Sequence, residues 1–376
     1  MTISFSKINI TKNDLINVNK ILKSGWLTHG KFNSLFEKEF IKFTRAKYAI
    51  TVSSCTAGLH LSCIAADFKK GDEVIIPSQT HVATAHAVEY TGAKAVFADV
   101  TFPEGNLDLD EIKKKITKKT KGVILVHMAG YPCNIVEVSN FCKKNNIILL
   151  EDCAHALGTY KNKIHAGNYG MTGSFSFYPT KQITTGEGGM VITNNKMVYK
   201  KIKMLKAFGI DKDIVNRKKV GDYDVKYLGY NFRITDFQAA IGYGQILDYK
   251  KNLERRKIIA KRYVQNLLQN KHIQFVPFSK DCSYFIFQIF CKQRDKLTSF
   301  LKKKKIGFSI HYKTPVPRMT YYKKKYKINM DKYFNSTKYG NTNISLPNYP
   351  KLKLSEVDYI CKVINQFFLN NENKKN

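Results

Sequence analysis

The fold is decided by three neighbouring segments, Glu151-Asp-Cys-Ala-His155, Gly173-Ser-Phe-Ser-Phe-Tyr-Pro-Thr-Lys181 and Thr184-Thr-Gly-Glu-Gly-Gly-Met190. The first follows Ile147-Ile-Leu-Leu150, an apolar run with the length of a strand that is buried on both faces of a parallel sheet. Within the second, Phe175-Ser-Phe177 has the same pattern and leads to a proline, which cannot pair in a sheet ladder. A carboxylate and a lysine therefore each follow a predicted buried strand, and a glycine-rich loop comes next.

Asp152 lies just past the carboxyl end of the first predicted strand. Open α/β sheets bind ligands at this edge, where a buried anion holds a cationic ring in its charged form by direct ion pairing. The alternative is that Glu151 and Asp152 form a polar strand end or a helix N-cap, which is the commoner role of an acidic pair. Taken alone, this motif favours the alternative.

Lys181 would project from the second predicted strand toward the same edge of the sheet. An amine that lies among aromatic side chains and near a cationic ring loses hydration, which lowers its pKa and favours the neutral nucleophile. Most lysines of this chain are expected to face solvent. The position of Lys181, after a strand and before a glycine loop, distinguishes it from them.

A phosphate site is predicted at the start of a helix. Residues 47–52 have the pattern of a strand, residues 53–58 that of a turn, and residues 59–66 that of an apolar helix. Free N–H groups at a helix start face an anion, and the helix dipole adds to the attraction. The candidate donors are the amides of Thr56 and Ala57 and the hydroxyls of Ser54 and Ser176. An ordinary Ser/Thr helix cap explains this segment equally well.

These three features together match the requirements of pyridoxal phosphate. The cofactor needs an amine that bonds to its aldehyde, a carboxylate that keeps its pyridine nitrogen protonated, and donors for its phosphate. The sequence therefore predicts a pyridoxal-phosphate site at the carboxyl edge of an α/β sheet.

The motifs also resemble those of the DegT-type nucleotide-sugar aminotransferases, which are fold-type I pyridoxal-phosphate enzymes. The resemblance extends over nearly the whole chain, at residues 25–30, 53–60, 71–77, 151–158, 174–190 and 229–240. It implies an α/β fold with a large domain, built on a mostly parallel doubly wound sheet, and a smaller C-terminal α/β domain. The alternation of strand and helix patterns from residue 48 to residue 193 agrees with such a sheet.

The chain is expected to divide into a large cofactor-binding domain, residues 1–245, and a small domain, residues 246–376. A helical pattern over residues 241–267 would link them. The small domain should contain a strand and two helices, at residues 284–290, 297–304 and 357–368. The polar residues from about 370 onward have the composition of a disordered tail.

The resemblance implies a role for individual residues of the site. Lys181 would bond to the cofactor and move protons, Asp152 would pair with the pyridine nitrogen, and His155 would contact the phenolic oxygen of the ring. The phosphate would be held by Thr56, Ala57 and Ser176. Asn231 matches an asparagine that reaches the phosphate in the neighbouring subunit, so the resemblance implies an obligate homodimer with shared active sites.

Further residues are implied to contact the cofactor face and the substrate. His81 takes the place of an aromatic residue that stacks on the cofactor, and an imidazole in this position should stay neutral beside a pyridinium. The segment from His311 to Lys313 lies near the active site in the family. His311, Tyr312, Lys313 and Thr28 are therefore candidates for sugar or diphosphate binding. A strand-end turn with polar surface groups accounts for the 310–313 segment equally well.

The reaction that the resemblance implies is transfer of an amine, with glutamate as the expected donor, to a keto carbon of a nucleotide-linked keto-deoxy sugar. A subgroup of the family that removes a hydroxyl group carries histidine where this chain has Lys181, which favours aminotransfer. The loop at residues 184–189 and the segment at residues 152–158 resemble those of enzymes that aminate C4 of nucleotide-linked 4-keto-6-deoxy sugars, as in perosamine or pseudaminic acid routes. The alternatives are amination at C3 and a different pyridoxal-phosphate enzyme that acts on free amino and keto acids.

The charge of the chain raises a non-enzymatic alternative. Its 63 lysines and arginines against 29 acidic residues give a net charge of +34, which is typical of a basic nucleic-acid-binding protein. The lysines are scattered, however, and only Lys323-Lys-Lys325, flanked by Tyr321, Tyr322 and Tyr326, has the interleaved aromatics of a stacking platform. We therefore expect no specific nucleic-acid partner, whereas a positive potential would attract a nucleotide diphosphate-sugar.

Cysteine spacing and the N-terminus indicate the compartment. The eight cysteines occur singly, without a CxxC pair, and are expected to be reduced core residues that form neither metal sites nor disulfides. The N-terminus lacks the basic start and the long apolar stretch of a secretory signal, and no apolar run reaches membrane-spanning length. A cytoplasmic enzyme without a membrane partner is therefore expected.

Overall fold

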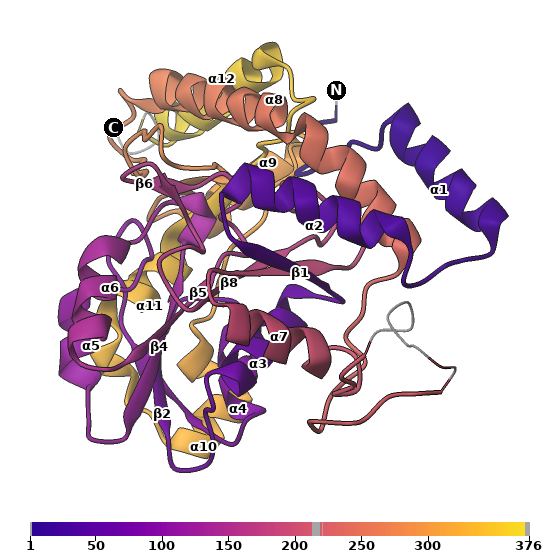
Figure 1. The fold of residues 1–376 in the computed structure, drawn as a ribbon. Helices are drawn as coiled ribbons and strands as arrows, with labels where there is room; N and C mark the ends of the chain where they lie inside the picture. The colour runs from indigo at the N-terminus through magenta and orange to yellow at the C-terminus, as the bar shows by residue number, and fades with distance from the viewer. Residues whose placement is uncertain (1, 213–218, 220, 373–376) are drawn as a thin grey trace.

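A seven-stranded sheet forms the centre of the computed structural model, which describes residues 2–212, 219 and 221–372 (Figure 1). The strand order is β1-β9-β8-β5-β4-β2-β3. The strands are β1 (Tyr48–Val52), β2 (Glu73–Pro77), β3 (Lys94–Ala98), β4 (Thr120–Val126), β5 (Ile148–Asp152), β8 (Thr172–Ser176) and β9 (Gly189–Thr193). Strands β3, β2, β4, β5 and β8 pair in parallel, and β9 is antiparallel to both of its neighbours. The expected mostly parallel sheet is confirmed.

Helices cover both faces of this sheet. They are α1 (Lys12–Ser24), α2 (Lys31–Thr44), α3 (Cys55–Ala65), α4 (Val82–Glu89), α5 (Leu109–Lys115), α6 (Ile135–Lys144), α7 (Lys196–Leu205) and α8 (Asp236–Leu267). Side chains alternate along β4: Ile124 packs in the cluster formed with α3 and α4, whereas Val123 and Leu125 pack with α5 and α6. Both faces are therefore buried, which explains why the strands are apolar throughout.

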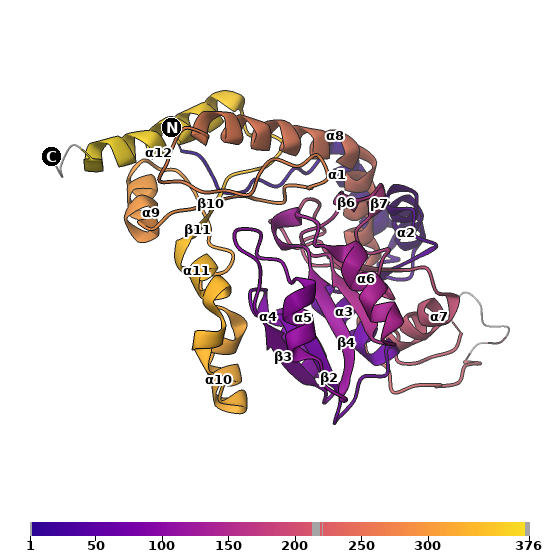
Figure 2. The same ribbon diagram turned by 90° about the vertical axis from the view of Figure 1, so that its left-hand side faces the viewer.

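The C-terminal part builds a smaller unit around an antiparallel pair of strands, β10 (Phe287–Phe290) and β11 (Asn343–Leu346). Its helices are α9 (Arg294–Lys303), α10 (Thr320–Tyr326), α11 (Phe334–Thr342) and α12 (Leu354–Glu372). The described residues also form short elements, namely β6 (Tyr160–Lys161), β7 (Ile164–His165) and the 3-10 turns η1 (Met128–Gly130), η3 (Val316–Arg318) and η4 (Met330–Lys332). Figure 2 shows α10 and α11 extending from this unit alongside the large sheet.

The two units interlock, and the predicted division between residues 245 and 246 falls inside the continuous helix α8. Ile3 packs in the core cluster of the C-terminal unit, while Tyr322 and Tyr333 pack against the large sheet. The domain boundary remains a prediction. Helix α12 continues to Glu372, so the tail expected from about residue 370 does not begin there, and residues 373–376 lie outside the described part of the chain. No helix among the described residues has the length and apolar character needed to span a bilayer.

Candidate active site

A cavity of about 520 Å³ opens at the carboxyl ends of β5 and β8, beside the start of α3. Its walls bring together most of the residues that the sequence predicts for the site: Ser54, Thr56, His81, Asp152, His155, Ser176, Lys181, His311 and Tyr312. Cys55, Thr80 and Glu187 also line it. Residues far apart in the chain converge here because parallel strands end at one edge of the sheet.

Asp152 is the last residue of β5 and is 4 % exposed. Thr84 donates a hydrogen bond to its Oδ2 at 2.7 Å, and the amide of Ala154 donates to its Oδ1 at 3.1 Å. The Cys55 thiol lies 4.0 Å from the same Oδ1. This carboxylate therefore has a fixed orientation, while part of its acceptor capacity still faces the cavity.

Lys181 follows β8 and turns its amine into the cavity. Burial of the amine lowers the pKa of Lys181 to about 8, although the nearby Cys55 and Asp152 oppose the shift. The Nζ atom lies 4.5 Å from the ring centroid of Phe285, a cation–π contact with a desolvated partner. The structure therefore provides a lysine with a substantial neutral fraction near physiological pH.

His155 is buried between several groups that fix its ring. The imidazole stacks on Phe285 with 4.4 Å between centroids and 22° between planes. Its Nδ1 accepts a hydrogen bond from the amide of Ala129 at 3.4 Å, and its Nε2 lies 3.4 Å from the hydroxyl of Tyr312. Because Nδ1 is an acceptor, the ring proton resides on Nε2. Burial, reinforced by the charge of Lys181, holds the pKa of His155 well below its ordinary value, so the ring is neutral.

The start of α3 supplies the predicted phosphate donors only in part. Ser54 is the N-cap of this helix and accepts the amide of Ala57 at 3.1 Å, so that amide already has a partner within the chain. A side chain at Gly189 would approach the carbonyl carbon of Ser54 within 2.6 Å, so only glycine lets β9 pass this close to the helix start. The Oγ atom of Ser176 accepts the amide of Tyr178 at 3.4 Å.

Three further rings border the cavity. The Nδ1 atom of His81 accepts the amide of Ala83 at 3.2 Å and thereby caps α4, and its ring centroid lies 5.6 Å from that of Tyr312. Burial, with the charge of Lys181, lowers the pKa of His81, and burial lowers that of His311 to about 3. These imidazoles are therefore neutral next to Lys181.

The structure does not bring Thr28, Asn231 and Lys313 into this cavity. Thr28 lines a separate cavity of about 150 Å³ that also contains Arg233. Asn231 is exposed, and its Oδ1 accepts a hydrogen bond from Arg233 Nε at 3.1 Å. Lys313 is exposed as well. Within one subunit, these predicted residues are thus not part of the Lys181 site.

Comparison with known proteins identifies the family. The profile of the DegT/DnrJ/EryC1/StrS aminotransferase family matches residues 9–365. The chain belongs to this family. It is 36% identical over 359 residues to the GDP-perosamine synthase of Escherichia coli O157:H7, a match that covers 93% of this chain and 94% of that protein.

Solved structures of this aminotransferase family have the same fold. PseC of Helicobacter pylori, an aminotransferase of pseudaminic acid biosynthesis, superposes with a TM-score of 0.91 at 27% identity, covering 98% of this chain and 100% of that one. The PLP-form of the sugar aminotransferase Spr1654 from Streptococcus pneumoniae superposes with a TM-score of 0.88 at 29% identity, covering 97% and 98%. The protein is a pyridoxal-phosphate-dependent sugar aminotransferase of the DegT family.

The cavity of this aminotransferase fits pyridoxal phosphate. The cavity brings together a buried carboxylate (Asp152), a neutral imidazole (His155) and a desolvated amine (Lys181), which would hold the pyridine nitrogen, the phenolic oxygen and the aldehyde of the cofactor. Thr56, at the start of α3, and Ser176 also line the cavity and would face the phosphate. The cavity thus carries groups suited to the ring nitrogen, the phenolic oxygen and the aldehyde of the cofactor, while the start of α3 provides only part of the predicted phosphate donors.

Sequence reasoning missed two residues of the aminotransferase site, Thr84 and Phe285. Thr84 lies in the segment Thr80–Thr84, whose pattern indicates only the stacking residue His81. Phe285 lies in an aromatic run that predicted a strand, and nothing in its spacing indicated contact with Lys181 or His155. Only the packing of the C-terminal unit against the large sheet brings it there.

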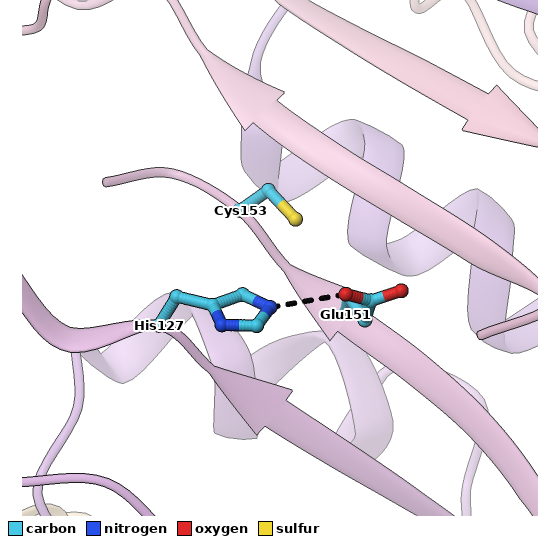
Figure 3. A group of neighbouring side chains, drawn as sticks. All are labelled: His127, Glu151 and Cys153. Atoms are coloured by element: carbon cyan, nitrogen blue, oxygen red, sulfur yellow. Dashed lines mark hydrogen bonds and ion pairs between the residues drawn. The ribbon is translucent and has the colours of Figure 1, made fainter. Parts of the chain in front are cut away.

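A group of potential metal ligands, His127, Glu151 and Cys153, lies at the carboxyl ends of β4 and β5 (Figure 3). The amide of Cys133 donates to His127 Nδ1 at 3.2 Å, so the ring proton is on Nε2 and is donated to Glu151 at 3.0 Å. Burial raises the pKa of the Cys153 thiol to about 12, which disfavours the thiolate that a metal ion requires. These hydrogen bonds stabilise the strand ends and leave no free ligand atom on His127.

The lysine run beside Tyr321 does not form an aromatic platform. Tyr322 is fully buried against the large sheet, and its hydroxyl lies 2.7 Å from His86 Nδ1. The hydroxyl of Tyr326 donates to Glu89. Two of the three aromatic rings are therefore engaged in internal packing, which argues against a surface that stacks nucleic-acid bases.

Proposed function

We propose that this enzyme transfers the amine of glutamate to the C4 keto carbon of a nucleotide-linked keto-deoxy sugar. The observation that carries the proposal is the convergence of Lys181, Asp152 and His155 on one cavity. These residues are the proposed catalytic groups. The alternatives are amination at C3 and transfer to a free keto acid.

The proposed chemistry assigns a task to each of these side chains. When bound, pyridoxal phosphate would supply an electron sink for the carbanion and an aldehyde that can take up the amine between the two half-reactions. Lys181, whose pKa of about 8 suits a base near neutral pH, takes the proton from the α-carbon of the donor and delivers one to the sugar carbon. Asp152 supplies a fixed negative charge beneath the cavity, and His155 holds one proton on Nε2.

The relatives support the choice of substrate. One is named GDP-perosamine synthase, and PseC is an aminotransferase of pseudaminic acid biosynthesis. The neutral rings of His81, His311 and Tyr312 border the cavity and provide flat surfaces for a sugar. A net charge of +34 favours the approach of an anionic nucleotide diphosphate.

The site is proposed to be completed in a homodimer. Asn231, assigned to the cofactor phosphate, lies outside the Lys181 cavity of its own chain, and we propose that Asn231 and Thr28 act in the neighbouring subunit. Helix α1 and the described residues between α7 and α8, 206–212 and 221–235, lie on the same side of the molecule (Figure 1). This side exposes large apolar side chains, namely Leu22, Trp26, Leu27, Val225, Tyr227 and Leu228. Such a surface is typical of a subunit interface.

The cytoplasm is the proposed compartment. All eight cysteines are free and buried, which suits a reducing environment. Fractionation of cells that express the native protein checks this placement.

The experiment that tests the function is mass spectrometry of the products from a panel of UDP-, GDP- and dTDP-linked 4-keto and 3-keto sugars, with glutamate as donor. The expected result is an amino sugar from a 4-keto substrate. Amination of a 3-keto sugar would correct the position, and transfer to free keto acids alone would overturn the proposed substrate class.

Light scattering of the same preparation gives the oligomeric state, with a dimer expected.

A further inference from the structure

A buried polar cluster behind the site is not used by any step of the proposed reaction. It consists of Gln182, Ser283 and Thr159, which are all buried. Gln182 directly follows Lys181, Thr159 immediately precedes β6, and Ser283 precedes β10. The cluster therefore joins the lysine loop, the segment after β5 and the C-terminal unit.

Two donors of the cluster converge on one acceptor, the carbonyl oxygen of His155. Gln182 Nε2 donates to it at 2.7 Å, and Ser283 Oγ donates to it at 3.0 Å. Gln182 Nε2 also donates to Ser283 Oγ at 3.1 Å, so the two donors hold each other. Thr159 Oγ1 donates to the carbonyl of Gly130 at 2.6 Å and lies 3.0 Å from Ser283 Oγ.

The turn at Gly130 depends on this arrangement. Gly130 has a φ of +93°, and a Cβ atom there would lie 2.3 Å from Ser283 Oγ and 3.0 Å from the carbonyl oxygen of His155. Its neighbour Ala129 directs its amide to Nδ1 of His155. The turn and the cluster thus hold the backbone of His155 and one edge of its ring.

The C-terminal unit supports the ring from another side. Phe285, two residues after Ser283, stacks on the imidazole and also lies beneath the amine of Lys181. Ser283 and Phe285 therefore fix the carbonyl and the ring face of the same histidine. Any shift of residues 283–285 moves both contacts together.

We propose that Gln182 and Ser283 are positioning residues that fix the backbone of His155, so that its imidazole keeps a constant orientation toward Lys181. The inference rests on the proposed function, because it gives His155 a task toward the cofactor. Since both donors reach one oxygen, either alone retains the carbonyl. Removal of both leaves a buried carbonyl without a partner, which the chain relieves by moving His155.

The test uses Gln182→Met, Ser283→Ala and the double variant, with Ser336→Ala as the matched control. Ser336 is fully buried on α11, and its hydroxyl donates to the carbonyl of Tyr333, whereas its amide, which the substitution keeps, donates to Asp99 Oδ1. The first measurement is the ring ¹⁵N spectrum of His155 in cofactor-free protein labelled at histidine, assigned with His155→Asn. The second is the visible circular dichroism of the cofactor-loaded protein, together with kcat and KM.

The expected result is non-additive. Each single variant and the control keep the His155 signal with its proton on Nε2, whereas the double variant loses this single tautomer and changes the sign or size of the cofactor dichroism. Its kcat falls by about 10²-fold with KM unchanged, as for a misplaced catalytic group.

A folded double variant with the wild-type His155 signal and dichroism would overturn the proposal, as would single effects that simply add. If the double variant does not fold, Gln182→Leu combined with Ser283→Gly replaces it, because this pair removes the same two donors. An unchanged His155 signal there also overturns the proposal. Failure of the proposed function shows separately, as wild-type protein that does not aminate any nucleotide sugar.

Discussion

Glu151 and Asp152 are adjacent buried carboxylates at the end of β5, and they serve different regions of the molecule. Glu151 accepts four hydrogen bonds, from the His127 ring and from the amides of Gly167, Tyr169 and Gly170. Burial alone would raise the pKa of Glu151, but these donors lower it. Asp152 has two close donors and lines the cavity.

The difference shows that neither burial nor charge identifies a functional carboxylate. Successive side chains of a strand point to opposite faces, so one carboxylate enters the scaffold and the next enters the site. The scaffold saturates Glu151, whereas Asp152 retains acceptor capacity for a ligand. Substitutions around Glu151 should therefore lower the stability of the protein, whereas substitutions in the cavity that Asp152 lines should lower its turnover.

The largest effect is expected for Lys181→Ala, in the cavity that Asp152 also lines. Loss of the base and of the covalent partner lowers turnover by about 10⁴-fold or more, while the protein stays folded and retains part of its cofactor affinity. Single-turnover kinetics and cofactor titration measure this. Lys201→Ala, which removes a half-buried lysine paired with the exposed Asp67, is the control and should retain full turnover. Borohydride reduction of the loaded wild type, followed by peptide mapping, should label Lys181, and a label elsewhere would contradict the assignment.

Asp152→Asn should lower kcat by about 10²–10³-fold, because the fixed negative charge beneath the cavity is lost. The shape is kept, and the asparagine oxygen can still accept from Thr84, so the melting temperature should change little. A large loss of stability with normal turnover per folded molecule would assign Asp152 to the scaffold instead.

Glu151→Gln is expected to act in the opposite way. An amide group would face the amides that the carboxylate now accepts, which destabilises the fold by about 3–5 kcal/mol, as for other broken buried pairs. Turnover per folded molecule should stay close to wild type. Chemical denaturation gives the free energy of unfolding, and active-site titration counts the folded enzyme. A stable but inactive variant would erase the distinction between the two carboxylates.

The pH dependence of Lys181 sharpens the comparison further. In cofactor-free protein its rate of modification by an amine reagent should rise about tenfold per pH unit up to about pH 8 and then level off, because only the neutral amine reacts. Asp152 raises this pKa, so Asp152→Asn should move the midpoint lower, and Glu151→Gln should leave it in place. A midpoint near the ordinary lysine value would contradict the desolvated site.

Much of the site could be predicted because it depends on local patterns. The apolar run at 147–150 predicted β5, and the position of Asp152 and Lys181 after buried strands placed both at one edge. The second strand lies at Thr172–Ser176, earlier than the predicted residues 175–177, because residues 172–174 pair with β5 although Gly173 interrupts the apolar pattern.

Contacts between distant segments could not be predicted in this way. Phe285 reaches His155 only through the packing of the C-terminal unit. Thr28 and Lys181 line two different cavities, because Thr28 lies with residues of α2 and of the segment before α8. The sequence pattern also gave no sign that Glu151 accepts four hydrogen bonds. Its donors are the His127 ring and three amides of a loop, and the sequence pattern does not specify where that ring and loop lie.

The smallest effect is expected for His81→Phe, at a residue that borders the same cavity as Asp152. Phenylalanine keeps a flat ring at the cavity, so turnover should be retained. It cannot accept the amide of Ala83, however, so the N-cap of α4 is lost and the free energy of unfolding should fall by about 1 kcal/mol. Thermal denaturation and steady-state kinetics separate the two outcomes, and His81→Asn, which can restore the cap but not the ring, is the matched control. A folded His81→Phe enzyme without activity would show that the imidazole takes part in the chemistry, whereas loss of stability alone makes it a helix cap that happens to border the site.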